Sequence, residues 1–312
     1  MKLPTRAHGL QVEPDGSILA VARRPGDWLL RWHPSTGRAV WQWQEDDRRL
    51  NGHGVHVGAT LIVTTETDRE TGQGWLGVRD RRSLELVDAW PTQGRDPHQV
   101  LVLPHALGRW PAGTLIVANG GVSTRPETGR NKTFGDRLDA SLVALDPKNG
   151  RLLGQWRLSD PYLSIRHLAS SPRGGTLGIA LQAEHADEAV RSAAPVLATW
   201  EGDQLTLASN QPALGGYGGD IVAFPSDHQG GFAVGCTRAD SLAFFTADGR
   251  FVQAVNHAQA CALACAGDNW WNAGQDGALT DRWTSNMPSS STSMRVPVAL
   301  DLQIDNHWQL YI

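Results

Sequence analysis

Three histidines in this sequence precede short apolar runs, and a polar side chain ends the next run in each case. His53 in GHGV precedes Glu66, His98 in PHQV precedes Asn119, and His167 in RHLA precedes Gln182. Several neutral imidazoles with one carboxylate form a site for first-row transition metals such as iron, copper or zinc rather than for magnesium or calcium. The recurrence therefore predicts one shared site for a metal or a metal-bearing ligand.

Other residues join this set by their position in the same pattern. His8 opens an earlier unit and His307 stands near the C-terminus, where a further unit would begin. Arg24, or its neighbour Arg23, ends the second apolar run of the first unit as Glu66 does in the next. The predicted metal ligands are His8, His53, His98, His167, His307 and Glu66, with Arg24, Asn119 and Gln182 beside them. Arg166, Arg130 and Lys132 are candidates for recruiting an anionic ligand instead.

A purely structural role for these histidines is the main alternative. In β-propellers of the WD type, which are rings of four-stranded sheets called blades, a Gly-His precedes the first strand of a blade. There the histidine belongs to a buried hydrogen-bonded network within one blade. Two features favour a shared site here. The partner residue changes from Glu to Asn to Gln between units, and no Trp-Asp dipeptide closes the units.

The elements that would position these residues repeat along the chain. Units begin at His8, His53, His98, His167 and Asp220, roughly 45 to 69 residues apart, and a degenerate sixth unit follows. Each contains four short apolar runs separated by turn residues, as in residues 8–44 with turns at 14–16 and 34–37. Four strands per unit is typical of a β-propeller blade, and the first strands of all blades line one central axis.

The ends of the chain decide how the ring closes. DNHWQLYI at the C-terminus and KLPTR before His8 supply only short segments for another blade. We expect an all-β protein, a single propeller domain over residues 1–312, with seven blade positions of which the closing one is incomplete. Six blades plus a clasp strand is the alternative. The short closing blade also leads us to expect that the natural chain begins upstream.

Composition excludes several classes of protein. High contents of glycine, 34 residues, and tryptophan, 13 residues, suit many short strands and tight turns. The net charge of −4 provides no basic stripe for nucleic acid, and no apolar run approaches the length of a membrane span. The opening MKLPTRAHGL has no apolar leader segment, which taken literally predicts a cytoplasmic location.

The sequence resembles a bacterial family of propellers known as DUF1513. The resemblance lies in GHGVHVGATLIVTTETDRETGQGWLGVRD, DPHQVLVLP, LIVANGGVSTRPETGRNK, ASLVALD, LSIRHLA and the terminal DNHW. The recurrent residues of the family correspond to His53, Glu66, Asp68, His98, Asn119, Gly120, Gly121, Arg130, Lys132, Arg166 and His167. Asp68 enters the set of candidate ligand-binding residues on this ground alone. Family members are usually exported by a twin-arginine leader and are often encoded beside iron-uptake proteins, which implies a periplasmic role linked to iron or haem.

The sequence therefore favours a periplasmic binding or accessory protein with a histidine-rich axial site for a transition metal, linked to iron uptake and to partner proteins of the cell envelope. Two alternatives stay open. One is a propeller enzyme, a lactonase or a metal-dependent oxidoreductase, that uses the same site. The other is a protein-interaction platform with structural histidines. No nucleophile elbow, P-loop or dinucleotide fingerprint is present.

Overall fold

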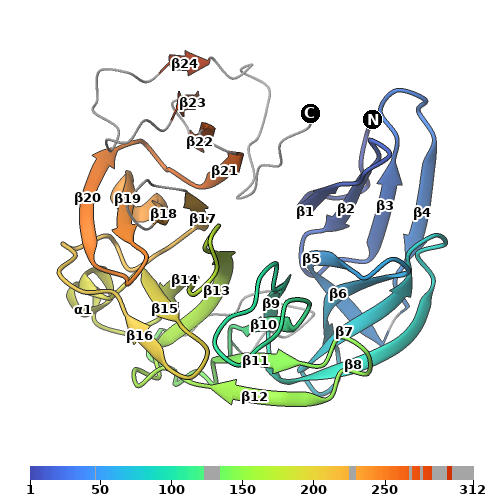
Figure 1. Ribbon diagram of the computed structural model, residues 1–312, viewed down its shortest axis with the longest axis horizontal. Helices are drawn as coiled ribbons and strands as arrows, with labels where there is room; N and C mark the ends of the chain where they lie inside the picture. The colour runs from blue at the N-terminus through green and yellow to red at the C-terminus, as the bar shows by residue number, and fades with distance from the viewer. Residues whose placement is uncertain are drawn as a thin grey trace.

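The computed structural model describes residues 1–45, 47–122, 134–224, 230–266, 269–274, 277–282 and 294–296. These residues form six antiparallel sheets of four strands, each built from strands consecutive in sequence. The sheets follow one another around a ring, as the colour gradient in Figure 1 shows. The fold is a β-propeller, as the repeats predicted.

Each sheet is one blade, numbered here in chain order. Blade 1 contains β1 (Ala7–Val12), β2 (Ile18–Ala22), β3 (Trp28–Trp32) and β4 (Ala39–Trp43). Blade 2 contains β5 (Arg48–Val57), β6 (Leu61–Asp68), β7 (Gln73–Asp80) and β8 (Leu86–Arg95). Blade 3 contains β9 (Pro97–Val102), β10 (Leu115–Asn119), β11 (Ser141–Leu145) and β12 (Leu152–Trp156).

The second half of the ring repeats this arrangement. Blade 4 contains β13 (Leu163–Ser170), β14 (Leu177–Ala183), β15 (Leu197–Trp200) and β16 (Leu205–Leu207), with helix α1 (Glu188–Ala193) between β14 and β15. Blade 5 contains β17 (Asp220–Phe224), β18 (Gly231–Cys236), β19 (Ser241–Thr246) and β20 (Phe251–Asn256), with the 3-10 turn Thr237–Ala239 after β18. Blade 6 contains β21 (Ala262–Ala266), β22 (Asn269–Gly274), β23 (Gly277–Arg282) and β24 (Met294–Val296).

The first strand of each blade lies innermost in Figure 1, and the fourth lies at the rim. Contacts between successive first strands run from β1 through β5, β9, β13 and β17 to β21. Residues on different first strands can therefore meet at the centre although they are far apart in sequence.

The closing blade was expected from residues 2–6 and the C-terminal segment. Residues 2–6 form no strand, and residues 297–312 lie outside the described part of the chain. The described residues thus form six blades and no seventh sheet. The insertion after Gly120 does join the second and third strands of its blade, as the sequence indicated.

Apolar side chains fill the spaces between blades, and tryptophans contribute much of this packing. Between blades 3 and 4, Trp110, Trp156 and Trp200 lie in one cluster, with the rings of Trp156 and Trp200 4.8 Å apart. Large aromatic side chains bury much apolar area each and suit the wedge-shaped space between twisted sheets. This packing accounts for three of the 13 tryptophans.

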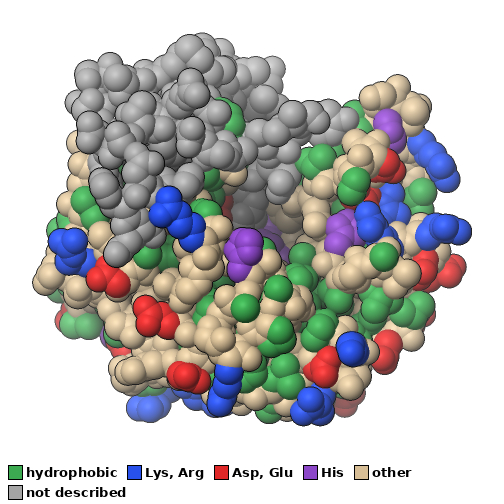
Figure 2. All heavy atoms as spheres, viewed as in Figure 1, with side chains coloured by type: hydrophobic (Ala, Val, Ile, Leu, Met, Phe, Trp, Pro, Cys, Tyr) green, Lys and Arg blue, Asp and Glu red, His purple; other side chains and the backbone are tan. Residues whose placement is uncertain are grey.

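Charged side chains of both signs are interspersed around the face shown in Figure 2 rather than gathered in one patch. Among the described residues, no helix is both long and apolar enough to cross a lipid bilayer.

Candidate metal centre

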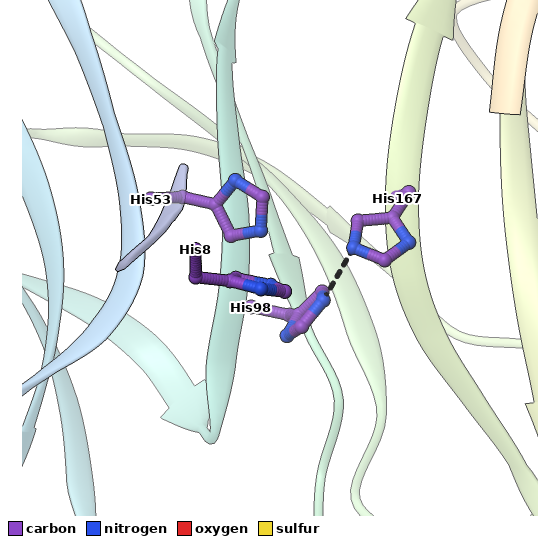
Figure 3. Close-up of side chains that lie close together, drawn as sticks. All are labelled: His8, His53, His98 and His167. Carbon is purple, nitrogen blue, oxygen red and sulfur yellow. Dashed lines mark hydrogen bonds between the residues drawn. The ribbon is translucent and has the colours of Figure 1, made fainter. Parts of the chain in front are cut away.

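Four histidines meet at the centre of the ring. His8, His53, His98 and His167 come from β1, β5, β9 and β13, and one ring nitrogen of each lies within 4.8 Å of the others. All four side chains are buried. Figure 3 shows the imidazoles pointing toward one another from separate strands. The four histidines therefore come together at the axis, as the sequence pattern led us to expect, and their use as a metal site stays a prediction.

The rings meet at their edges rather than by stacking. The centroids of His98 and His167 lie 4.4 Å apart, and those of His8 and His53 lie 4.8 Å apart, at interplanar angles of 61° and 80°. The Nε2 atoms of His98 and His167 are only 2.6 Å apart. Two ring nitrogens at this distance can share one proton or can both face one cation. Ring nitrogens that converge on a small space could hold a metal ion.

Each of the four histidines occupies an irregularity in the first strand of its blade. The pairing of β1 with β2 skips His8, and the pairing of β9 with β10 skips His98. His53 lies in the shift between Leu50 and Gly54, and His167 lies in the shift between Ile165 and Leu168. The first strands of blades 5 and 6 pair with their neighbours without a shift and carry no histidine.

A β-bulge turns a side chain away from the regular alternation of the strand. In this propeller the bulges turn four imidazoles from the packing faces toward the axis. The histidines therefore lie within the first strands, whereas the sequence pattern had placed them in the connections before those strands.

Two glycines let β1 and β5 approach at the site. Gly52 has φ +103°, and a Cβ atom there would lie 2.6 Å from Cδ2 of His8. A Cβ atom on Gly9 would lie 2.4 Å from the carbonyl oxygen of Gly52. Only glycine combines this backbone conformation with such close contact. The first glycine of GHGV, Gly52, is thus required by the position of His8 in the neighbouring blade.

Hydrogen bonds fix the bulge of β5 against β9. The Thr65 hydroxyl lies 3.3 Å from the carbonyl oxygens of both His53 and His98. The Asn51 side chain donates to the carbonyl oxygen of Pro97 over 2.9 Å. These bonds hold the backbones that carry His53 and His98, so the imidazoles are placed before any ion binds.

A buried carboxylate between two arginines adjoins the cluster. Asp96 accepts from Arg166 over 2.7 Å and forms a second, short ion pair with Arg24. Arg24 also places Nη2 3.5 Å from Nδ1 of His98. Asp96 has a left-handed backbone conformation, φ +52°, which aspartate tolerates better than most residues. The site therefore consists of four imidazoles with this ionic network on one side.

Gly120 provides the space for that network. A Cβ atom there would lie 2.6 Å from both the Arg166 guanidinium and the Asp96 carboxylate. Its own carbonyl accepts from the Ser164 hydroxyl over 2.8 Å. The sequence pattern missed Asp96, although an acidic residue directly before Pro97 and His98 was a usable signal.

A family model described as "Protein of unknown function (DUF1513)" matches residues 1–311. The chain belongs to the DUF1513 family. No curated protein matches its sequence.

Solved structures similar to this DUF1513 protein share its propeller-like fold at low identity. Virginiamycin B lyase from Staphylococcus aureus has a TM-score of 0.66 and 10% identity, covering 96% of this chain and 87% of that chain. Hydrazine synthase from Kuenenia stuttgartiensis has a TM-score of 0.52 and 12% identity, covering 92% and 99%. The calcium-binding protein regucalcin from Agrobacterium tumefaciens has a TM-score of 0.52 and 13% identity, covering 86% and 82%. These likenesses concern the fold.

Glu66 does not join the histidines in this DUF1513 protein, contrary to the sequence pattern. Its buried carboxylate forms an ion pair with Arg79 over 2.8 Å and accepts from Thr64 and Gln44. Gln44 belongs to the loop after blade 1, so the side chain faces the space between blades 1 and 2. The strand alternates its faces, and the adjacent Thr65 is the residue that reaches the site.

Three further predicted residues form hydrogen bonds with residues other than the four histidines. The buried Asn119 donates to the carbonyl oxygen of Thr92 over 2.9 Å, which links blades 3 and 2. Gln182 donates to Glu184 over 2.6 Å. Asp68 closes the turn after β6, where backbone and side-chain bonds from Thr71 lower the pKa of its carboxyl. Asp68 is not part of the four-histidine group.

The remaining predicted residues divide into two groups. Arg24 and Arg166 lie beside the cluster, bound to Asp96. His307, Arg130 and Lys132 lie outside the described residues. Of the histidines without a repeat position, His105 is exposed and His56 lies 3.1 Å from Glu13, away from the axis.

A cavity of about 460 Å³ follows the axis on one side of the cluster. His53 is part of its lining, together with residues of β1, β9, β17 and β21 such as Gln11, Gln99 and Asp220. Asp220 accepts from the backbone N–H of Leu263 over 3.0 Å, so it links blades 5 and 6. The cavity gives small molecules a place next to one imidazole of the site.

Proposed function

We propose that the four-histidine centre binds one ion of a first-row transition metal, namely iron, copper or zinc. The observation that carries the proposal is the meeting of four buried imidazole nitrogens within 4.8 Å of one another. Each imidazole lies at a bulge of its first strand, and the two first strands that carry no histidine lack such a bulge. Four bulged strands that bring four donors together favour a shared ligand-binding role over a separate structural role for each histidine in its own blade.

The donor set argues for the class of metal. Nitrogen donors suit copper, zinc and iron, whereas calcium and magnesium prefer oxygen. The one carboxylate described in the network, Asp96, is held by Arg24 and Arg166. The likeness to regucalcin concerns the fold alone and gives no support to a calcium site in this chain.

An enzyme is the second candidate, and the axial cavity favours it. Four protein ligands leave room on an ion that takes five or six donors, and the cavity reaches His53. A bound metal would supply Lewis-acid or redox chemistry, and the four histidines would hold it. The lactonase and oxidoreductase alternatives both remain proposals of this kind. The specific test is turnover of lactone and redox substrates by protein loaded with each metal, compared with the His98→Ala/His167→Ala variant.

We also propose that the site serves iron handling in the periplasm, together with iron-uptake proteins of the cell envelope. The family resemblance supports this role, and the donor set accepts ferrous iron. Fractionation of the native host, followed by pull-down of the untagged protein from the periplasmic fraction, tests location and partners together. Recovery in the cytoplasm only would contradict the proposal.

The metal proposal is tested by elemental analysis of protein purified without a histidine tag. About one equivalent of iron, copper or zinc is expected, either as purified or after anaerobic reconstitution. The His98→Ala/His167→Ala variant should lose it, because removing two of four ligands leaves too few donors. The matched control is His33→Ala/His105→Ala, which removes two histidines away from the axis and should retain the metal.

Circular dichroism and thermal unfolding of both variants establish that they are folded. Absence of metal from the parent protein after reconstitution with all three metals would overturn the proposal. The histidines would then be structural, with His98 and His167 joined by a hydrogen bond alone.

A further inference from the structure

We propose that the metal held by the four histidines takes a small anion as an additional ligand, and that Arg24 binds this anion. The inference rests on the proposed metal site and names the class of ligand that the site would accept. The ligand is a small anion that coordinates through one donor atom and accepts an N–H bond, such as a carboxylate, a halide or azide.

The first argument is the charge of the site. The four imidazoles are neutral ligands when they bind a metal. The adjoining network holds one carboxylate, Asp96, and two guanidiniums, Arg24 and Arg166. The side chains described at the site thus carry a net positive charge before any ion is bound. A divalent metal adds two further charges in a buried place, where opposite charge is strongly favoured.

The second argument is the geometry of Arg24. Its Nη2 lies 3.5 Å from Nδ1 of His98, at the long limit for a hydrogen bond. Arginine only donates, so Nδ1 must be the acceptor in this contact. The Nε2 atom of the same ring faces His167 over 2.6 Å and is the nitrogen placed for the metal. A neutral His98 that coordinates through Nε2 carries its proton on Nδ1, so Arg24 then needs another acceptor.

The third argument is access. In the network, the side chains of Asp96 and Arg166 are 1% and 4% exposed, whereas that of Arg24 is 16% exposed. Arg24 is therefore the most exposed member of the network. Its Nη1 stays bound to Asp96, which fixes the guanidinium with Nη2 toward the histidines. A guanidinium held in this way binds anions with a defined orientation.

The test uses copper(II)-loaded protein titrated with azide, followed by the azide-to-copper charge-transfer absorption and by electron paramagnetic resonance. Arg24→Gln should weaken azide binding about tenfold or more, because it removes a charge-assisted bond. Arg24→Lys should restore part of the affinity. The matched control is Arg23→Gln, which removes the same charge from the adjacent exposed residue and should change the affinity less than about twofold.

Copper content is measured in every variant. Full copper content with equal azide affinity in the parent and in Arg24→Gln would overturn the inference while the metal site stands. Full copper content with no azide binding to the parent would overturn it as well. Failure of the parent to bind copper, iron or zinc is a different result, because it removes the proposed function itself.

Discussion

The pair formed by His98 and His167 is the most constrained contact of the site. Their Nε2 atoms are 2.6 Å apart, and a neutral imidazole has one N–H, so without a metal one ring must donate to the other. The Arg24 contact at Nδ1 of His98, at 3.5 Å, favours His98 as the donor. Metal binding would replace this shared proton, so the same two atoms serve both states.

Glu66 gives a prediction at the residue scale. Its carboxylate and the Arg79 guanidinium are 0% and 2% exposed and lie 2.8 Å apart. Glu66→Gln should lower the free energy of unfolding by about 3 kcal/mol, because it leaves a buried arginine without its counter-charge. Metal content should not change, since Glu66 faces blade 1 rather than the axis. Urea unfolding and elemental analysis of the variant check the two parts.

The metal content of Glu66→Gln also has an outcome that would contradict this assignment. A folded Glu66→Gln protein that loses its metal would show that the carboxylate belongs to the site, as its place in the sequence pattern had suggested.

At the scale of elements, the sequence predicted the blades but not which face of a strand each side chain occupies. Four apolar runs between turns specify a blade because each run must pair with the next one. The His8, His53, His98 and His167 positions followed, since first strands line the axis. Glu66 shows the limit, because a shift of one residue along β6 exchanges the two faces, and Thr65 reaches the site instead.

The bulges mark a second limit. The residue types in β1, β5, β9 and β13 do not predict where the bulges occur, because a bulge arises from pairing between strands. The role of Asp96, which lies between β8 and β9, depends on its left-handed backbone. Repeat spacing therefore located the donors, while the supporting network needed the paired strands.

Glu13 joins blades 1 and 2 and gives a prediction at this scale. It follows β1, binds Arg31 of β3, accepts from Ser17 over 2.8 Å and lies 3.1 Å from His56 of β5. Burial alone would raise the pKa of Glu13, but the bonds from His56, Arg31 and Ser17 outweigh it and lower the pKa from 4.5 to about 2. The contact thus stabilises the folded state fully above about pH 4.5 and is lost as the pH falls toward 2.

Glu13→Gln should accordingly lose about 3 kcal/mol of stability at neutral pH and show a flatter decline between pH 5 and about 2. Urea unfolding at a series of pH values measures both effects. Glu85→Gln removes an exposed carboxylate from blade 2 and serves as the control. This account would be contradicted if the free energy of unfolding fell equally steeply between pH 5 and about 2 in Glu13→Gln and in the parent protein.

For the whole molecule, the site joins one part of the ring and leaves the other part outside. The four candidate ligands come from blades 1 to 4, whereas the described first strands of blades 5 and 6 contribute none. A bound metal would therefore connect four blades that otherwise contact one another through packing and hydrogen bonds between neighbours. The described parts of blades 5 and 6 would gain no such connection to the metal.

This asymmetry predicts where metal stabilises the protein. A ligand present at about 100 times its dissociation constant stabilises the folded state by about 2.7 kcal/mol, which corresponds to a rise in Tm of roughly 5 °C for a chain of this size. Hydrogen exchange should slow at β1, β5, β9 and β13 and change little at β17 and β21, because only the first four strands carry ligands. Zinc is the suitable probe since it has no redox chemistry. The His98→Ala/His167→Ala variant should show neither effect, and equal protection of all six first strands on adding zinc would contradict a site confined to blades 1 to 4.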